Sequence, residues 1–318
     1  MTTVGTATAD RGELATGRLA VGERRTEAQC TLPVAVINGD RAGERLYLQA
    51  ASDGDELNGV GVVAQVVQQL DPSNLAGEVV VVGIVNVPGF EAETHRNPLD
   101  DTKINRTYPG AESGSASERI AAATFSLARK ADIILDLHQG STSRMINECR
   151  VRCGAQHRLH EQCLELAKVF DTGHILDRKG PDGQLARAGP EAGIPTVDPE
   201  LGGCVGWDPE SIAVGVEGVF NVLRYYDFLD GEVSPGPQLR AQRFEQYATP
   251  TSGLIQLVPE LGERVAPGDD LFEVMSVFGE HKHTVKANEE GILWRSRRLP
   301  QVASGEYVCT LGANLDTY

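Results

Sequence analysis

The chain has 318 residues, of which 41% are hydrophobic, so it can bury one large core or two ordinary ones. Its 45 acidic and 29 basic residues give a net charge of −16, which argues against nucleic acid or an anionic membrane as main partner. Six irregularly spaced cysteines argue against a disulfide scaffold, and no apolar run resembles a membrane helix or a signal peptide. We therefore expect a cytoplasmic protein with reduced thiols.

Strands and helices are expected to alternate along most of the chain. Residues 1–10 are small and polar, so we expect them to be frayed. Apolar runs predict buried strands at residues 32–39, 45–51, 78–86, 131–138, 149–153 and 193–203. Helical spacing predicts helices at residues 59–70, 118–130 (with Ser117 as a cap), 156–170 and 209–229. This alternation indicates a layered α/β fold with a largely parallel sheet.

Two segments break this alternation. Residues 87–114 form a long irregular stretch with few apolar residues, and loops of that kind are often functional. The segment GEVSPGPQ after Asp230 is typical of a linker, and short strands and turns follow it. We therefore predict an α/β domain over residues 1–235 and a small all-β domain over residues 236–318.

Four ionisable residues stand at or just past the ends of predicted strands: Asp53, Glu56, His138 and Glu200. Parallel strands bring such ends to one edge of a sheet. Asp53, Glu56 and His138 would supply the three protein ligands of a catalytic metal site. Asp136 shares a strand face with His138 and is placed to orient its imidazole. Carboxylates in turns are more often merely solvated, so spacing alone leaves both interpretations open.

The motifs DGDELNGV, NVPGFEAETHRNPLDDTKINRTYPG, ILDLHQG and GIPTVDPELGG occur in this order. Together they resemble the succinylglutamate desuccinylase/aspartoacylase family of zinc-carboxypeptidase-like hydrolases. The resemblance covers nearly the whole chain, including the C-terminal β module. It implies a three-layer α/β domain with a mixed, largely parallel sheet, followed by an all-β domain.

The resemblance also implies roles for individual residues. Glu56 and His138 match two zinc ligands of the family, and Glu200 matches its general base. Arg96 matches an arginine that stabilises the developing oxyanion. The residues matched to substrate binding are Asn105, Arg106 and, through a looser alignment, Arg187.

Three further positions are interpreted from the residues themselves. Ser141, just after His138, would hydrogen-bond a ligand near the metal. His95, beside Arg96 in the long loop, is either a substrate contact or a surface residue. Arg295 is expected to belong to a charged edge of the β module.

One position departs from the family pattern, because Asp53 stands where the family has a histidine. A divalent ion with two carboxylates and one imidazole is formally neutral, so it should acidify a water and polarise a carbonyl less. Oxygen ligands also move the preference from zinc somewhat towards manganese or iron. Either the site is retuned for another acyl group or metal, or catalysis is lost.

These observations favour a metal-dependent amidohydrolase that cleaves the amide bond of an N-acylated amino acid or a related small molecule. Two alternatives are a catalytically inactive small-molecule or metal-binding protein on the same fold, and a carboxypeptidase. Whether the β module covers the mouth of the site or mediates assembly of a homo-oligomer is left open.

Overall fold

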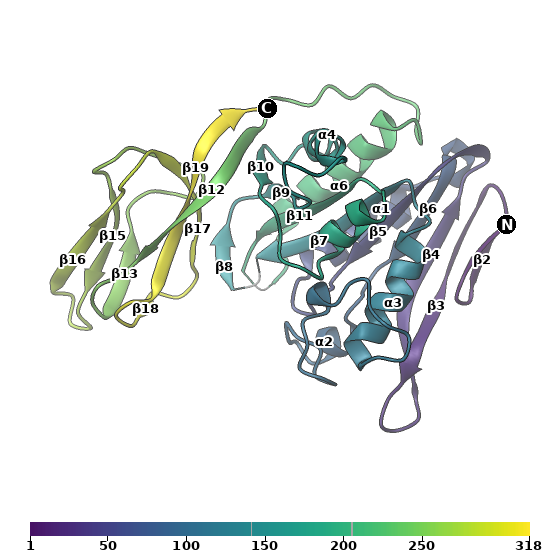
Figure 1. Cartoon of the computed structure of the whole chain (residues 1–318), viewed down its shortest axis with the longest axis horizontal. Helices are drawn as coiled ribbons and strands as arrows, with labels where there is room; N and C mark the ends of the chain where they lie inside the picture. Colours follow the sequence, from purple (N-terminus) through teal and green to yellow (C-terminus); the bar gives the residue numbers. More distant parts are fainter. Residues whose placement is uncertain (141, 205) are drawn as a thin grey trace.

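The computed structural model describes residues 1–140, 142–204 and 206–318, and places helices on both faces of one large β-sheet (Figure 1). The helices are α1 (Asn58–Gln69), α2 (Val87–Glu91), α3 (Ala116–Ala128), α4 (His160–Phe170), α5 (Leu185–Glu191) and α6 (Pro209–Tyr225). Short 3-10 turns occur at Pro72–Asn74 and Ile104–Arg106.

The strands of the first two thirds of the chain include most of the predicted ones. They are β1 (Thr2–Val4), β2 (Ala7–Ala9), β3 (Glu13–Glu23), β4 (Gln29–Asn38), β5 (Arg41–Ala50), β6 (Ala76–Val82), β7 (Ile133–Gly140), β8 (Ser143–Met145), β9 (Glu148–Val151), β10 (His174–Asp177) and β11 (Thr196–Gly203). The C-terminal strands are β12 (Leu239–Ala248), β13 (Gly253–Leu257), β14 (Arg264–Val265), β15 (Asp270–Met275), β16 (His281–Lys286), β17 (Gly291–Arg297), β18 (Gln301–Val302) and β19 (Tyr307–Thr317).

Thirteen strands within the described residues form the large sheet, in the order β14-β17-β19-β12-β10-β9-β11-β7-β5-β6-β4-β3, with β8 beside β17. At its centre, β5, β7 and β11 are parallel neighbours. β9 runs antiparallel to β11, and β3, β4 and β6 are joined by antiparallel pairs. The sheet is therefore mixed, and the carboxyl ends of its three central strands meet at one edge.

Alternate residues of the central strands bury two separate cores on opposite faces of the sheet. Leu46 and Leu48 of β5 pack with residues of α1, α4 and α6. Tyr47, between them, faces the other way and packs with residues of α3, α5 and the N-terminal strands. Both faces are covered, which explains the nearly continuous apolar sequence of β5, β6 and β7. The predicted three-layer α/β architecture is confirmed.

Three local expectations differ from the structure. The first ten residues are not frayed, because β1 and β2 form a hairpin that buries Val4, Ala7 and Ala9. Helix α3 is capped by Ser115 and not by Ser117, because Ser115 and Glu118 have the spacing of a reciprocal capping box. Strand β10 and helix α5 were not predicted, and both are short.

The C-terminal strands continue the large sheet. β12 pairs in parallel with β10, and β19, β17 and β14 follow it outwards. A second sheet, β16-β15-β13-β18, packs against these strands around Phe272, Val274 and Leu311. The all-β region lies at one end of the molecule (Figure 1).

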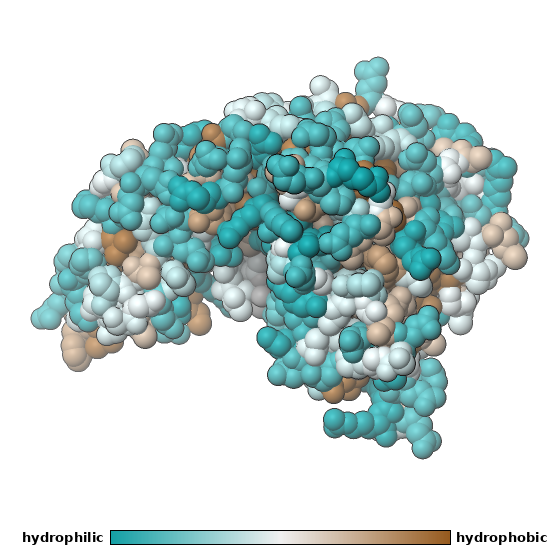
Figure 2. All heavy atoms as spheres, viewed as in Figure 1, coloured by the Kyte–Doolittle hydropathy of each residue, from teal (hydrophilic) through white to brown (hydrophobic). Residues whose placement is uncertain are grey.

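The surface has the character that the charge composition predicts. Hydrophilic residues cover most of the face in Figure 2, and hydrophobic residues form small separate patches. No helix in the described part of the chain is long and apolar enough to cross a membrane.

Trp294 holds the β region to the α/β region and gives a test of this junction. It is fully buried among Leu176, Ala241 and Ile292, and its indole N–H donates to Glu148. Trp294→Ala should lower the free energy of unfolding by about 3–5 kcal/mol, measured by urea denaturation. The other tryptophan, Trp207, is 58% exposed, and its alanine variant should lose about 1 kcal/mol or less. Equal losses of unfolding free energy in the two variants would contradict the role of Trp294 at this junction.

Candidate active site

A tight turn after β5 places Asp53 and Glu56. The Gly54 N–H donates to the carbonyl oxygen of His95 (3.3 Å), which ties the turn to the long loop. A Cβ atom at Gly54 would lie 2.3 Å from the carbonyl carbon of Gly89, so the contact requires glycine. The sequence DGDE is thereby held against residues 87–97.

Gln139 fixes the position of Glu56 and the start of α1. Leu57, at the helix start, makes no side-chain cap bond, and instead Gln139 Oε1 accepts the N–H groups of Leu57 (2.9 Å) and Asn58 (3.0 Å). The Gln139 N–H donates to Glu56 Oε2 (3.1 Å). A residue of β7 therefore caps the neighbouring helix and orients a carboxylate of the site.

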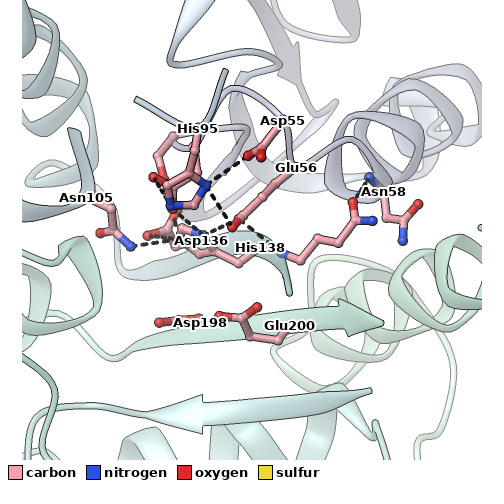
Figure 3. A network of polar contacts seen from close by, with 12 residues as sticks. Asp55, Glu56, Asn58, His95, Asn105, Asp136, His138, Asp198 and Glu200 are labelled. Carbon is pink, nitrogen blue, oxygen red and sulfur yellow. Dashed lines mark hydrogen bonds and ion pairs between the residues drawn. The ribbon is translucent and has the colours of Figure 1, made fainter. Parts of the chain in front are cut away.

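His138, at the end of β7, lies at the centre of a buried cluster of carboxylates (Figure 3). Its Nδ1 is 2.8 Å from Glu56 Oε2 and 3.7 Å from Asp53 Oδ2. Its Nε2 is 3.2 Å from Asp136 Oδ2, and Gln49 donates to the other oxygen of Asp136 (2.8 Å). Among the residues that the structure describes, Asp136 Oδ2 is buried without a hydrogen-bond partner, so its contact with the imidazole is electrostatic. Burial lowers the pKa of His138, but the surrounding carboxylates outweigh it and hold that pKa well above its usual range.

Two residues of the long loop complete the cluster. His95 points into it, with Nδ1 2.9 Å from Asp55 Oδ1 and Nε2 3.6 Å from Asp53 Oδ1 (Figure 3). The Lys103 ammonium is 3.0 Å from Asp53 Oδ2 and 2.8 Å from His95 Nε2. Because lysine only donates, His95 presents the lone pair of Nε2 to this ammonium. The sequence left the orientation of His95 open and contained no specific signal for Lys103.

This cluster fits a divalent metal ion. Donor atoms of Asp53, Glu56 and His95 lie within 4.8 Å of one another, and His138 Nδ1 lies beside the two carboxylates. Among the described residues, Asp53 Oδ1 is buried without a hydrogen-bond partner. Burial and the adjacent carboxylate of Asp53 raise the pKa of Glu56 to about 7. Carboxylate and imidazole donors suit zinc, manganese and iron.

Glu200 lies opposite His138 in the register of the parallel pair β11–β7 (Figure 3). Its carboxylate is ion-paired with Arg150 of β9. Burial tends to raise the pKa of Glu200, but the charges of Arg150, His138 and Lys103 outweigh this and hold the pKa below its usual range. The lowered pKa favours the ionised form of this carboxylate, one oxygen of which is paired with Arg150.

The remaining predicted residues lie in different surroundings. Asn105 is buried, with Nδ2 3.1 Å from His138 Nε2 and Oδ1 accepting the Leu185 N–H (3.2 Å). Arg106 is exposed. Ser141 lies outside the described residues.

Two predicted arginines make their described contacts elsewhere. Arg96 is exposed and donates to the carbonyl oxygen of Asp101 (2.9 Å). Arg187 pairs with Asp182 and Glu191. The described contacts thus join Asp136 and Asn105 to the metal candidates, and Glu200 faces His138 in the strand register, but Arg96 and Arg187 make no such contact within the part of the chain that the structure describes. The roles predicted for these two arginines stay predictions.

The chain is similar to known proteins in sequence and in fold. The sequence model of the succinylglutamate desuccinylase/aspartoacylase catalytic domain matches residues 42–226. An N-alpha-acetyl-L-2,4-diaminobutyric acid deacetylase from Halomonas elongata is 29% identical over 284 residues, which are 85% of this chain and 81% of that protein.

Solved structures share the fold. A succinylglutamate desuccinylase from Silicibacter superimposes with a TM-score of 0.86 and 23% identity, over 99% of this chain and 100% of that one. The ectoine utilization protein EutE (DoeB) from Ruegeria pomeroyi, solved with product bound, has the same score and identity over 97% of this chain and 98% of that one.

Fold and sequence together define a hydrolase of linear carbon–nitrogen amide bonds, as the motifs predicted. More specifically, the chain belongs to the succinylglutamate desuccinylase/aspartoacylase family, because the match to the family covers more than half of its length.

The cap that Gln139 provides can be tested by substitution. Gln139→Ala leaves two helix N–H groups without their acceptor and should lower the free energy of unfolding by about 1–3 kcal/mol in urea denaturation. Gln65→Ala, at an exposed position of the same helix, is the control and should change it by about 0.5 kcal/mol or less. Equal stability of the two variants would show that the cap contributes nothing.

Proposed function

We propose that the protein is a metal-dependent deacylase that hydrolyses the amide bond of an N-acylated amino acid or a related small molecule. The observation that carries this proposal is the placement of Glu200 opposite His138 of the Asp53–Glu56–His138 cluster. Family membership and the similarity to a named deacetylase support the same reaction.

Asp53, Glu56 and His138 would hold the metal, and His95 is a fourth candidate ligand, whose Nε2 would have to release the Lys103 ammonium to bind it. When bound, a divalent metal acidifies a water molecule and polarises the carbonyl that this water attacks. Zinc is the first candidate, and manganese and iron are alternatives that the second carboxylate favours.

The residues of the chain supply the proton transfers. Glu200 accepts a proton as the water oxygen bonds to the acyl carbon. It then delivers a proton to the nitrogen as the carbon–nitrogen bond breaks, which yields a carboxylic acid and an amine. With Nδ1 on the metal, the Nε2–H of His138 would face Asp136 Oδ2 at 3.2 Å, and Asn105 packs beside the ring.

The positive charge of Lys103 compensates for the aspartate that stands at position 53 in place of the family's histidine. An aspartate in place of a histidine makes the centre more negative by one charge. The Lys103 ammonium, 3.0 Å from Asp53 Oδ2, adds one positive charge at the same place. We infer that the pair keeps the electrostatic balance that carbonyl polarisation needs, so that the site is retuned and not inactivated.

Metal binding is the first test. Elemental mass spectrometry of the tag-free protein should find about one divalent metal per chain. Asp53→Ala and His95→Ala should each weaken metal binding by roughly 10- to 100-fold in equilibrium titrations. His281→Ala, at an exposed position of β16, is the control and should bind as the unmodified protein does. No bound metal after incubation with zinc, manganese or iron would contradict the mechanism and favour a non-catalytic binding protein.

The general base is tested separately. Glu200→Gln should lower kcat/KM for N-acetyl amino acids by about 10²- to 10⁴-fold, because the amide cannot accept the proton. Metal content should stay unchanged, since Glu200 is not a proposed ligand. Glu290→Gln, whose partner is the exposed Arg264, is the control. Full activity of Glu200→Gln would exclude Glu200 as the base, and release of C-terminal residues from peptides would favour a carboxypeptidase.

A further inference from the structure

A basic pocket lies where the α/β region meets the C-terminal strands. It has a volume of about 410 Å³ and is lined by residues of β9, the loop after β10, β12 and β17. Among the described residues, none of those lining it is acidic, although the chain as a whole carries a net charge of −16. Its basic side chains are Arg150, Arg152, Arg178, Lys179 and Arg295.

Arg295 is the clearest sign that this pocket is built for an anion. The side chain is half-buried, its Nε donates to Thr310 Oγ1 (3.1 Å), and its guanidinium lies 5.5 Å from the centre of the Phe244 ring. Within the described part of the chain, no carboxylate lies within 4.0 Å of it. Burial and the nearby Arg150 lower the pKa of Arg295. A partly desolvated cation without a counter-ion is costly unless a ligand supplies the charge.

The neighbouring basic residues leave positive charge in the pocket. Arg152 Nε donates to Gln184 Oε1 (3.3 Å), and its nearest described carboxylate oxygen, Asp198 Oδ2, is 3.9 Å away. Burial raises the pKa of Asp198 to about 7, which weakens it further as a partner. Arg178 and Lys179 are exposed at the pocket. Among the described residues, neither of them forms an ion pair.

Arg150 joins this pocket to the catalytic residues. It lines the pocket, and it is also ion-paired with Glu148 and with Glu200, the proposed base. In the register of β9 and β11, Arg150 lies opposite Asp198, two residues before Glu200. An anion in the pocket would therefore be separated from the proposed base by a single side chain.

We propose that this pocket binds a carboxylate of the substrate, with Arg152 and Arg295 as the specificity-determining residues. Planar guanidinium groups match the two oxygens of a carboxylate. This inference rests on the proposed function. It narrows the class of substrate, because the N-acylated substrate would then carry a carboxylate that extends from the amide bond towards the C-terminal region. The resemblance to the family implies carboxylate binding by Asn105, which contacts His138, and by Arg106, and that prediction stands beside this pocket.

A binding experiment tests the pocket without relying on hydrolysis. Glutarate is the anionic probe, and glutaramide is its neutral counterpart of similar shape. Calorimetric titration should show glutarate binding to the full-length protein and no glutaramide binding. Arg295→Gln should weaken glutarate binding roughly 10- to 100-fold, because one charge-assisted contact is lost.

Two further variants keep the test decisive. Lys179→Gln changes an exposed residue of the pocket, so it should fold normally and still weaken glutarate binding several-fold. Arg298→Gln changes an exposed arginine that is not part of the pocket lining, and it should bind glutarate as the unmodified protein does. Equal glutarate affinity in Lys179→Gln, Arg295→Gln and the unmodified protein, or equal binding of glutaramide, would overturn the proposal.

Inhibition kinetics with glutarate then distinguish a substrate subsite from a separate effector site. Glutarate should inhibit hydrolysis of N-acetyl amino acids competitively, and Arg295→Gln should raise the inhibition constant by the same factor as the dissociation constant. Non-competitive inhibition would contradict the substrate role. Arginine-dependent glutarate binding without any detectable hydrolysis would instead contradict the proposed deacylase function and leave the anion pocket standing.

Discussion

The imidazole of His138 lies among the carboxylates of Asp53, Glu56 and Asp136, all of them buried. Buried negative charges must be neutralised, since their burial in a medium of low dielectric constant costs several kcal/mol each. The surrounding elements supply positive charge or hydrogen-bond donors to this cluster. β7 contributes the backbone N–H of Gln139, β5 contributes Gln49, and the long loop contributes Lys103. The order of strands β5, β7 and β11 brings these groups together, and a divalent cation would complete the neutralisation.

The same constraint bears on Asp53, which stands where the resemblance to the family implies a histidine. A single exchange of histidine for aspartate would add a buried charge and remove an imidazole. In this chain, the ammonium of Lys103 contacts the carboxylate, and the imidazole of His95 faces it from the long loop. The three residues thus form one electrostatic unit, although 42 and 50 positions of sequence separate the loop residues from Asp53.

Sequence patterns predicted the layered fold and the strand ends that carry Asp53, His138 and Glu200, because apolar runs and terminal polar residues are local features. They did not predict the orientation of His95 or the contact of Lys103, because a loop of this length can fold back in many ways. Arg150 and Arg152 were recognised only as part of a short strand, since local sequence does not show which neighbour that strand will face. Arg295 was interpreted as a charged edge, yet the packing of β17 beside the α/β region leaves it half-buried. The N-terminal hairpin was missed because its buried residues are short runs of small side chains.

The parallel pairing of β10 with β12 has a mechanical consequence. Hydrogen bonds along His174–Leu176 and Leu239–Ala241 would have to break before the C-terminal region could swing as a rigid lid. The pairing therefore favours joint movement of the two regions over a rigid swing of the C-terminal strands. If the pocket at this junction binds a substrate carboxylate as proposed, selection among ligands depends on its complementarity to them. Evolution can alter that complementarity by single exchanges on β17, while the strands that perform the chemistry stay unchanged.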